Sequence, residues 1–358
     1  MVIGGGMWYH GGAQPWHIRE HDGGRGTRGV EPKLGLPACP LLPTYRDMAR
    51  LIIFRLLQGV LALLVVSALT FALLAAAGGD ALTALGQDPA VSEETIRGLR
   101  RVYGLDQPLT VRYGRWLAGA SRGRLGHSIY FQAPVGGVIW PRFGRTMALA
   151  TAALLIAWPL ALALGASAAR HAGTWRDRIC GAVVLIAAST PRLVLALCAL
   201  AVIARTTLVS AGGPTGELSA GAWLLRLLTP ALVLSVPLVA LFLAQTRESV
   251  GAVLSQDFVR AARAKGLPER AVMLRHVMRP GLNPLITVFG YSLGALMSGS
   301  VVVEKVLGWP GLGELSVTAV QSRDVPLLMG VVLVTATAVL AGNLVADILL
   351  RLNDPRLR

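Results

Sequence analysis

The sequence predicts an all-α, polytopic membrane protein with about six transmembrane helices. Hydrophobic residues make up 54% of the 358 residues and charged residues only 15%, whereas a soluble domain carries about 25% charged residues. The apolar residues also form continuous runs rather than amphipathic stripes. Runs of about 18 residues or more are long enough to cross the hydrocarbon core of a bilayer, so these two observations together indicate membrane spans.

Six apolar segments are the predicted spans. They cover approximately Leu51–Ala77, Met147–Ala169, Ile179–Ala204, Leu227–Ala244, Leu285–Val303 and Leu327–Leu350. Proline occurs inside the second and fourth, where neighbouring helices can satisfy the freed backbone groups. Glycine and alanine recur in the last two, which favours close contact between helices.

The segments between and around the spans divide the chain further. Residues 1–47 are rich in Gly and Pro and contain no apolar run, so we expect a disordered extension before a first helix at 48–77. Met48, followed by a positive charge and a span, is an alternative start. Residues 78–145 are predicted as a small external helical subdomain, residues 146–354 as the transmembrane core and residues 355–358 as a tail.

Two helices are expected in the external region. Glu93 and Glu94 fit the first turn of one helix, which Gly104 can close. A second helix follows Pro108 and contains Tyr113 and Trp116. These aromatic residues are typical of anchors at a membrane surface, and a role in receiving a partner protein is the alternative.

The distribution of basic residues predicts the orientation. Arg and Lys exceed acidic residues most clearly in the loops after the second and fourth spans, which places these loops and both termini in the cytoplasm. The net charge of +15 does not indicate nucleic-acid binding, because the basic residues are scattered between apolar spans instead of forming one face.

Motifs for catalysis are absent from the sequence. There is no GxxxxGK[ST] loop, no HExxH and no GxSxG, and the three cysteines fit no zinc spacing. We therefore expect no catalytic residue, no metal and no cofactor in this chain. Asp347, the one carboxylate near the end of a span, is expected to pair with Arg351 one helical turn away.

Arg192 is a charged residue within the third predicted span, directly after Pro191. One interpretation is a cation that lines a transport path and attracts a substrate carboxylate. The other is that the span is broken at Ser189–Pro191, which leaves Arg192 near water.

A charged, helix-prone insert, residues 246–284, separates the fourth and fifth spans. Ser255 or Asp257 can cap a helix that begins at Phe258 and ends at Gly266, and Pro268 can begin a second helix. This predicts a helix–turn–helix elbow in water, with Phe258 and Val259 as apolar contacts for a partner. An ordinary basic loop is the alternative. The candidate contact residues are Asp257, Phe258, Arg260, Ala261, Ala262, Arg263, Ala264, Lys265 and Gly266.

The insert reads FVRAARAKGLPERAVMLRHVMRPGLNP and resembles the EAA loop of ABC importer permeases, especially the B-type permease of dipeptide, oligopeptide and nickel importers. Further segments are similar to that family in the same order. They are Arg101 with Gly104–Asp106 and Pro108–Leu109, then Gly123–Ser128, Val302–Glu304, Trp309–Gly313, Arg323–Pro326 and Asp354–Arg358.

The resemblance implies a type I importer permease in a bacterial inner membrane. Its expected partners are a homologous C-type permease, two cytoplasmic ATPases that bind ATP and Mg²⁺, and an external substrate-binding protein. Residues 257–266 would be the coupling helix in an ATPase cleft. Trp309, Pro310, Gly311 and Gly313 would face the binding protein. Two residues depart from the family pattern, since Arg260 replaces the Glu of the general motif and Arg192 replaces an uncharged residue.

The resemblance favours import of dipeptides or oligopeptides. Nickel or another small solute is the alternative substrate, although no histidine, a preferred nickel ligand, lies inside a predicted span. An ATPase-independent channel or carrier and a structural membrane scaffold are alternatives from other classes.

Overall fold

The computed structural model describes residues 45–76, 93–102, 104, 106–206 and 220–353. The predicted disordered extension lies outside these residues except for Tyr45–Asp47, which are the first residues of α1. The tail at 355–358 also lies outside them.

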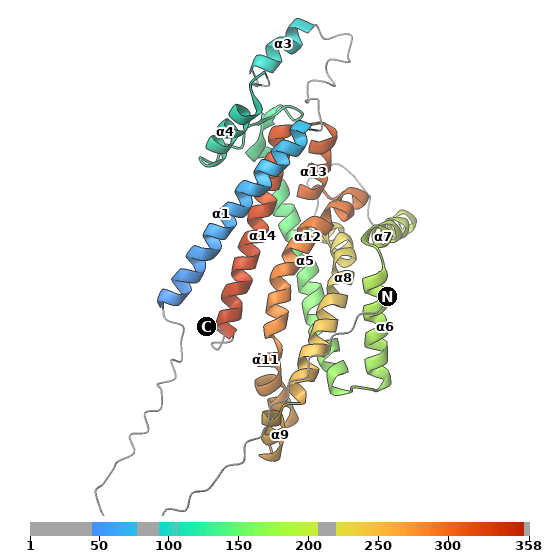
Figure 1. Ribbon diagram of the computed structural model, residues 1–358. Helices are drawn as coiled ribbons and strands as arrows, with labels where there is room; N and C mark the ends of the chain where they lie inside the picture. Colours follow the sequence, from blue (N-terminus) through green and yellow to red (C-terminus); the bar gives the residue numbers. More distant parts are fainter. Residues whose placement is uncertain (1–44, 77–92, 103, 105, 207–219, 354–358) are drawn as a thin grey trace, which may run out of the picture. The chain divides into compact units, whose positions relative to one another are not determined.

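The described residues form helices and one short hairpin (Figure 1). The long helices are α1 (Tyr45–Ala76), α5 (Val135–Arg170), α8 (Ala220–Leu254), α12 (Asn283–Leu307) and α14 (Val325–Asn353). The shorter ones are α3 (Glu93–Val102), α4 (Leu109–Ala120), α6 (Trp175–Ser189), α7 (Arg192–Thr206), α9 (Asp257–Ala264), α10 (Glu269–Ala271), the π-helix η1 (Val272–Val277), α11 (Met278–Gly281) and α13 (Leu312–Gln321). Strands β1 (His127–Ser128) and β2 (Ala133–Pro134) pair antiparallel, with His127 opposite Pro134.

The predicted membrane character is confirmed. Among the described residues, four helices are long and apolar enough to cross a bilayer: α1 from Ile52, α5, α8 from Trp223, and α14. Two bent pairs raise the number to six if each pair is one span. One pair is α6 with α7, and the other consists of the two parts of α12 on either side of residue 298.

Three predicted segments differ from the structure. The second span is part of a longer helix that begins at Val135, so the last residues of the predicted external region belong to α5. The fourth span is likewise part of the longer α8. The third span is wrong as a continuous helix, because α6 and α7 are bent by 93° around Thr190 and Pro191. Proline has no backbone N–H and disfavours helical geometry in the preceding residue, which explains the break.

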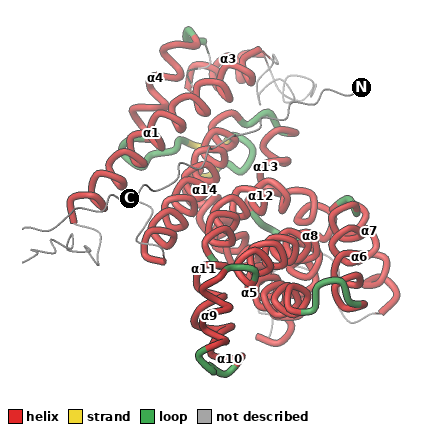
Figure 2. Tube along the Cα trace, turned by 60° about the horizontal axis from the view of Figure 1, so that its bottom comes forward, coloured by secondary structure: helices red, strands yellow, loops and turns green. Residues whose placement is uncertain are grey.

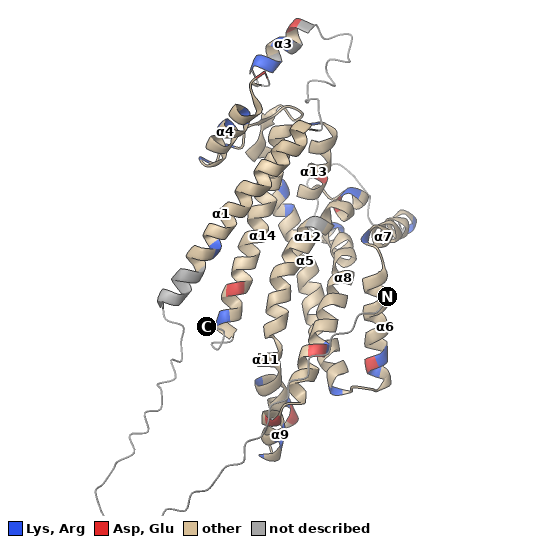
Figure 3. Ribbon diagram, viewed as in Figure 1, with Lys and Arg blue, Asp and Glu red and all other residues tan. Residues whose placement is uncertain are grey.

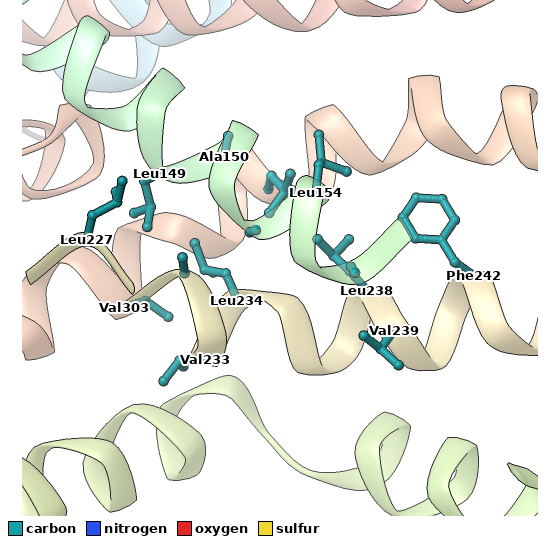
Figure 4. Packing of buried hydrophobic residues seen from close by; sticks show 14 of the residues in the cluster. Leu149, Ala150, Leu154, Leu227, Val233, Leu234, Leu238, Val239, Phe242 and Val303 are labelled. Atoms are coloured by element: carbon teal, nitrogen blue, oxygen red, sulfur yellow. The ribbon is translucent and has the colours of Figure 1, made fainter. Parts of the chain in front are cut away.

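The core of the bundle is the contact between α5 and α8. Leu149 and Leu154 of α5 face Leu234, Leu238 and Phe242 of α8, and all five are buried (Figure 4). Burying side chains of this size contributes roughly 1.5–3 kcal/mol each relative to water, and less relative to lipid.

Glycines allow the helices to approach closely. A β-carbon at Gly165 of α5 would lie 2.6 Å from Cβ of Thr246 on α8, and one at Gly290 of α12 would lie 2.7 Å from Cβ of Ala346 on α14. The predicted role of small residues in the last two spans as helix contacts is therefore confirmed.

The two ends of the long helices carry different substructures. At one end, α4 lies against α1, where the Tyr113 hydroxyl is 3.0 Å from Ser67 Oγ and its ring centroid is 5.5 Å from that of Phe71. The described part of the 78–145 region thus contains the two expected helices, α3 and α4, with Gly104 between them in the left-handed conformation (φ 64°), and also the β1–β2 hairpin and the start of α5. At the other end, α9 and α10 project beyond the long helices (Figure 2).

Candidate functional site

The predicted elbow exists, although its cap differs from the expectation. α9 begins at Asp257, after Gln256 in extended conformation, and no side chain caps it. Asp257 is the first residue of the helix and pairs with Arg260 at 3.4 Å, so the prediction that Ser255 or Asp257 precedes and caps the helix is wrong. Gly266 follows the helix with a φ of 76°, which a residue with a side chain rarely adopts.

α9 has one face that packs on its own chain. Val259 is fully buried and Ala262 is 7% exposed, in a cluster with Val250 of α8 and with Val272 and Val277 of the π-helix. Both side chains are thus covered by their own chain, and contact of Val259 or Ala262 with a partner stays a prediction. The cluster fixes α9 to the end of α8.

The rest of the α9 surface is open. Phe258 remains 49% exposed although it is a large apolar residue. The other exposed candidates are Asp257, Arg260, Ala261, Arg263, Ala264, Lys265 and Gly266. An exposed aromatic ring between small residues and cations is suited to a complementary groove on another protein.

An ion pair closes the elbow. The Arg263 guanidinium donates to both oxygens of Glu269 at 2.9 and 3.2 Å, and so joins α9 to α10 across the Gly266 turn. The hydrogen bond from Arg263 holds the pKa of Glu269 below its usual value, and the same bond raises the pKa of Arg263. Both side chains are exposed to a large extent, so the pair orients the two helices more than it stabilises the protein.

A second ion pair fixes the base of the elbow. Arg247 near the end of α8 contacts Asp177 at the start of α6, with Nε 2.6 Å from Oδ1 and Nη2 3.1 Å from Oδ2. Asp177 also accepts a hydrogen bond from the Gly173 backbone N–H at 3.0 Å. Figure 3 shows basic and acidic residues near the lower end of α6 and around α9. Sequence reasoning missed this pair, because 70 residues separate its members.

Arg192 is the first residue of α7, directly after the break. Its Nη1 donates to the Ala295 carbonyl of α12 at 3.2 Å, and its guanidinium occupies the space in which a side chain at position 299 would lie. It is half-buried and lines a cavity of about 710 Å³ together with Tyr291, Asn343 and Asp347. The interpretation that the span is broken at this point is confirmed, and the cavity leaves the transport role open as a prediction.

Asp347 has a partner in α1. Its Oδ2 lies 2.8 Å from Nε of Arg55. This ion pair ties α14 to the first helix, whereas the sequence predicted a pair with Arg351 within α14.

The Trp309–Gly313 segment is a buried corner. Trp309 is 6% exposed, and its indole N–H donates to the Arg145 carbonyl at 3.3 Å. Gly311 and Gly313 are buried against the carboxylate of Glu304, which leaves Pro310 as the partly exposed member of the four predicted contact residues. Contact of this segment with a binding protein stays a prediction, and it would have to involve Pro310 or the backbone.

Two buried carboxylates organise the end of the bundle that carries α4. Glu304 accepts hydrogen bonds from the Thr146 hydroxyl and from the backbone N–H of Gly313. Asp324 accepts from the Ser128 hydroxyl at 2.6 Å and from the Leu327 N–H at the start of α14. Each carboxylate joins segments that are far apart in sequence, and sequence reasoning missed both of them. Among the described residues, no group of three or more His, Cys, Asp or Glu side chains could hold a metal ion.

The chain matches two families along its length. Residues 48–153 match the N-terminal part of binding-protein-dependent transport system membrane components, and residues 161–358 match the binding-protein-dependent transport system inner membrane component. The second match includes the elbow, Arg192 and the Trp309–Gly313 segment.

Several curated relatives are similar over almost their whole length. A putative peptide permease protein of Brucella ovis is 36% identical over 317 residues, which are 87% of this chain and 99% of the relative. The oligopeptide transport system permease protein AppB of Bacillus subtilis is 34% identical over 319 residues, with the same coverage. The glutathione transport system permease protein GsiC of Escherichia coli O6:H1 is 34% identical over 312 residues, again 87% of this chain and 99% of the relative.

These matches agree with the several apolar helices and the elbow between α8 and α12. This chain belongs to the family of binding-protein-dependent transport system inner membrane components, the membrane-spanning permease subunits of ABC importers.

Proposed function

We propose that this chain is the B-type permease subunit of an ATP-driven importer for dipeptides or oligopeptides. The observation that carries the proposal is a small helix, α9, which is rooted in the chain by Val259 and Ala262 and presents Phe258 outward. In a chain of this family, such a helix is suited to bind a separate ATPase and to pass its conformational change on to the transmembrane helices. The relatives named as peptide and glutathione permeases support the substrate class.

The coupling follows from the packing of the elbow. α9 docks in a cleft of a cytoplasmic ATPase, with the ring of Phe258 in an apolar pocket and Arg260 and Lys265 against acidic or carbonyl groups at its rim. The buried face moves α8 and the π-helix with it, because packed side chains transmit displacement. ATP and Mg²⁺ are bound and hydrolysed by the partner ATPases, and this chain contributes no catalytic residue.

The remaining subunits follow the family pattern. A homologous C-type permease supplies the other half of the translocation path, and an external binding protein delivers the substrate near Pro310. The elbow and both termini lie in the cytoplasm of a bacterial cell. Within the path, the cavity beside Arg192 offers a guanidinium to the carboxylate of a peptide.

The test is ATP-dependent uptake by the complete importer in proteoliposomes. Phe258→Ala changes an exposed ring, so the chain should assemble in the membrane as the unchanged protein does but lose at least tenfold in uptake and in substrate-stimulated ATP hydrolysis. Leu274→Ala is the matched control, because Leu274 is a 73% exposed apolar residue on the π-helix outside α9. Replacements at Ala262 or Gly266 are less informative, since they disturb the fold of the elbow itself.

The outcomes separate the alternatives. Full uptake by the Phe258→Ala importer, or uptake by the permeases without the ATPases, contradicts the coupling proposal and favours a channel or carrier. Uptake of labelled Ni²⁺ but of no di- or tripeptide by the same vesicles contradicts the peptide proposal and leaves the coupling intact. A purified assembly whose ATP hydrolysis does not respond to any substrate favours a scaffold.

A further inference from the structure

A second cavity lies at the other end of the helices, below α4. It has a volume of about 570 Å³, within the range of small-molecule sites. Part of its lining is apolar: Phe71 of α1, Trp116 of α4, Ile129 of the hairpin loop and Met329 of α14. The cavity is therefore built by four segments that are far apart in sequence.

The rest of the lining is strongly basic. Arg112, Arg115, Arg122 and Arg124 all line the cavity, and no Asp or Glu is among its lining residues. Arg112 lies over the ring of Phe71, with the guanidinium carbon 5.9 Å from the ring centroid. Within the described part of the chain, none of the four forms an ion pair with an acidic side chain. Four cations beside one cavity repel one another, so an anion in the cavity would be held favourably.

The position of the cavity narrows the choice of anion. Phe71 and Met329 belong to candidate membrane helices, within a few residues of the ends at Ala76 and Val325. α4 lies across these ends and carries Tyr113 and Trp116, the residue types that occur at the level of lipid headgroups. A cavity with an apolar floor in the hydrocarbon and a cationic rim at the headgroups matches a molecule that has both parts.

We propose that this cavity binds an anionic phospholipid. The phosphate lies among the four arginines, and the first part of an acyl chain covers Phe71 and Met329. An acidic surface of a protein partner fits less well, because it would have to insert apolar groups into a recess beside the membrane.

The experiment measures lipid retention by the purified importer. The complete complex is equilibrated with mixed micelles of dioleoylphosphatidylglycerol and dioleoylphosphatidylcholine, and native mass spectrometry counts the lipids that stay bound. Arg115→Gln with Arg122→Gln removes two positive charges from the cavity lining, and neither arginine forms an ion pair with a described residue. Since each arginine near an anionic surface contributes about fivefold in affinity, the pair should weaken phosphatidylglycerol binding by about 25-fold. Phosphatidylcholine binding should not change.

Two further variants sharpen the result. Arg176→Gln with Arg178→Gln removes the same charge at exposed positions of α6 and should retain phosphatidylglycerol. Ala118→Leu keeps all charges but fills part of the cavity from an exposed position, and it should also lose the lipid.

The proposal is overturned if the Arg115/Arg122 variant and the Arg176/Arg178 variant retain the lipid equally, or if Ala118→Leu retains it in full. It is also overturned if glycerol 1-phosphate displaces the lipid at millimolar concentration, which would indicate a site for a free phosphate ester. Weaker association with the substrate-binding protein and unchanged lipid retention would assign the cavity to that protein.

Discussion

Glu304 is a fully buried carboxylate whose hydrogen bonds hold one corner of the fold. It accepts from the Thr146 hydroxyl at 2.9 Å and from the N–H groups of Gly313 and Glu314 at 2.7 and 3.2 Å. The carboxylate therefore connects α5, α12 and the start of α13. Glycine is required at 311 because a β-carbon there would overlap the carboxylate.

Glu304→Ala should lower the free energy of unfolding by about 2–4 kcal/mol, because it leaves a hydroxyl and two backbone donors without a partner in the interior. The thermal unfolding midpoint of the purified protein in detergent measures this. Glu314→Ala is the matched control, since only the backbone of Glu314 takes part in the corner. Equal midpoints for the two variants would contradict the role of the carboxylate.

Among the elements, α9 shows most clearly how adjacent residues serve different purposes. Val259 is fully buried in the cluster that roots the helix, and Phe258 next to it is half exposed. The sequence FVRAARAKG predicts a short helix that ends at Gly266; the structure confirms the helix, which ends at Ala264, two residues before the glycine. Which face is buried could not be predicted, because the covering residues come from α8 and the π-helix.

Substitution by aspartate should affect amide exchange at one of these two positions and not at the other. Val259→Asp places a charge in an apolar cluster and should open the elbow, so that amide hydrogens of residues 257–264 exchange at least tenfold faster. Phe258→Asp should leave their exchange unchanged, because the side chain is half exposed and does not belong to the cluster that holds α9. Hydrogen exchange with mass spectrometry measures both variants. Protection that survives in Val259→Asp would show that the cluster is not what holds α9.

The Arg263–Glu269 ion pair gives the elbow a defined pH dependence. The hydrogen bond from Arg263 keeps the pKa of Glu269 below the ordinary 4.5, so the pair is fully formed above that pH and is lost as the pH falls through the lowered pKa. Amide exchange in residues 257–271, corrected for its intrinsic pH dependence, should be constant from about pH 5 to 8 and rise only in more acidic solution.

In Glu269→Gln, amide exchange in residues 257–271 should be as fast at every pH as it is in the unchanged protein in acid, because the glutamine side chain has no charge to pair with Arg263. A transition in the unchanged protein near neutral pH, or the same acid transition in Glu269→Gln, would assign the pH dependence to another group.

The limits of sequence reasoning are also clearest at the level of elements. Apolar runs predict where helices lie, but a proline inside such a run does not predict whether the helix continues. Pro159, Pro230 and Pro237 lie inside continuous helices, whereas the helix is interrupted at Pro191. The hydrogen bonds of the two buried carboxylates could not be predicted in the same way. Thr146, which donates to Glu304, lies 158 residues away in the sequence, and Ser128, which donates to Asp324, lies 196 residues away. Such pairs are created by tertiary packing and leave no local pattern.

For the molecule as a whole, the orientation in the membrane is open to a direct test. In a background with Cys39, Cys180 and Cys198 replaced by serine, Arg270→Cys in the elbow should react with a membrane-impermeant maleimide only after the cells are permeabilised. Arg101→Cys in α3 should react in intact cells, because the positive-inside rule places it outside. The cysteine-free protein supplies the background signal. The reverse pattern would invert the topology and remove the elbow from the reach of a cytoplasmic ATPase.

The length of α5 has a mechanical consequence. Its 36 residues extend about 54 Å, well beyond the roughly 30 Å of hydrocarbon in a bilayer. One end begins at the hairpin beside Asp324, and near the other end Ala166 and Ala169 pack against the cluster that holds α9. One continuous helix is therefore long enough to reach both surfaces of the membrane. A tilt of α5 caused by movement of α9 would displace the hairpin end of the same helix directly, with no other helix needed to transmit it.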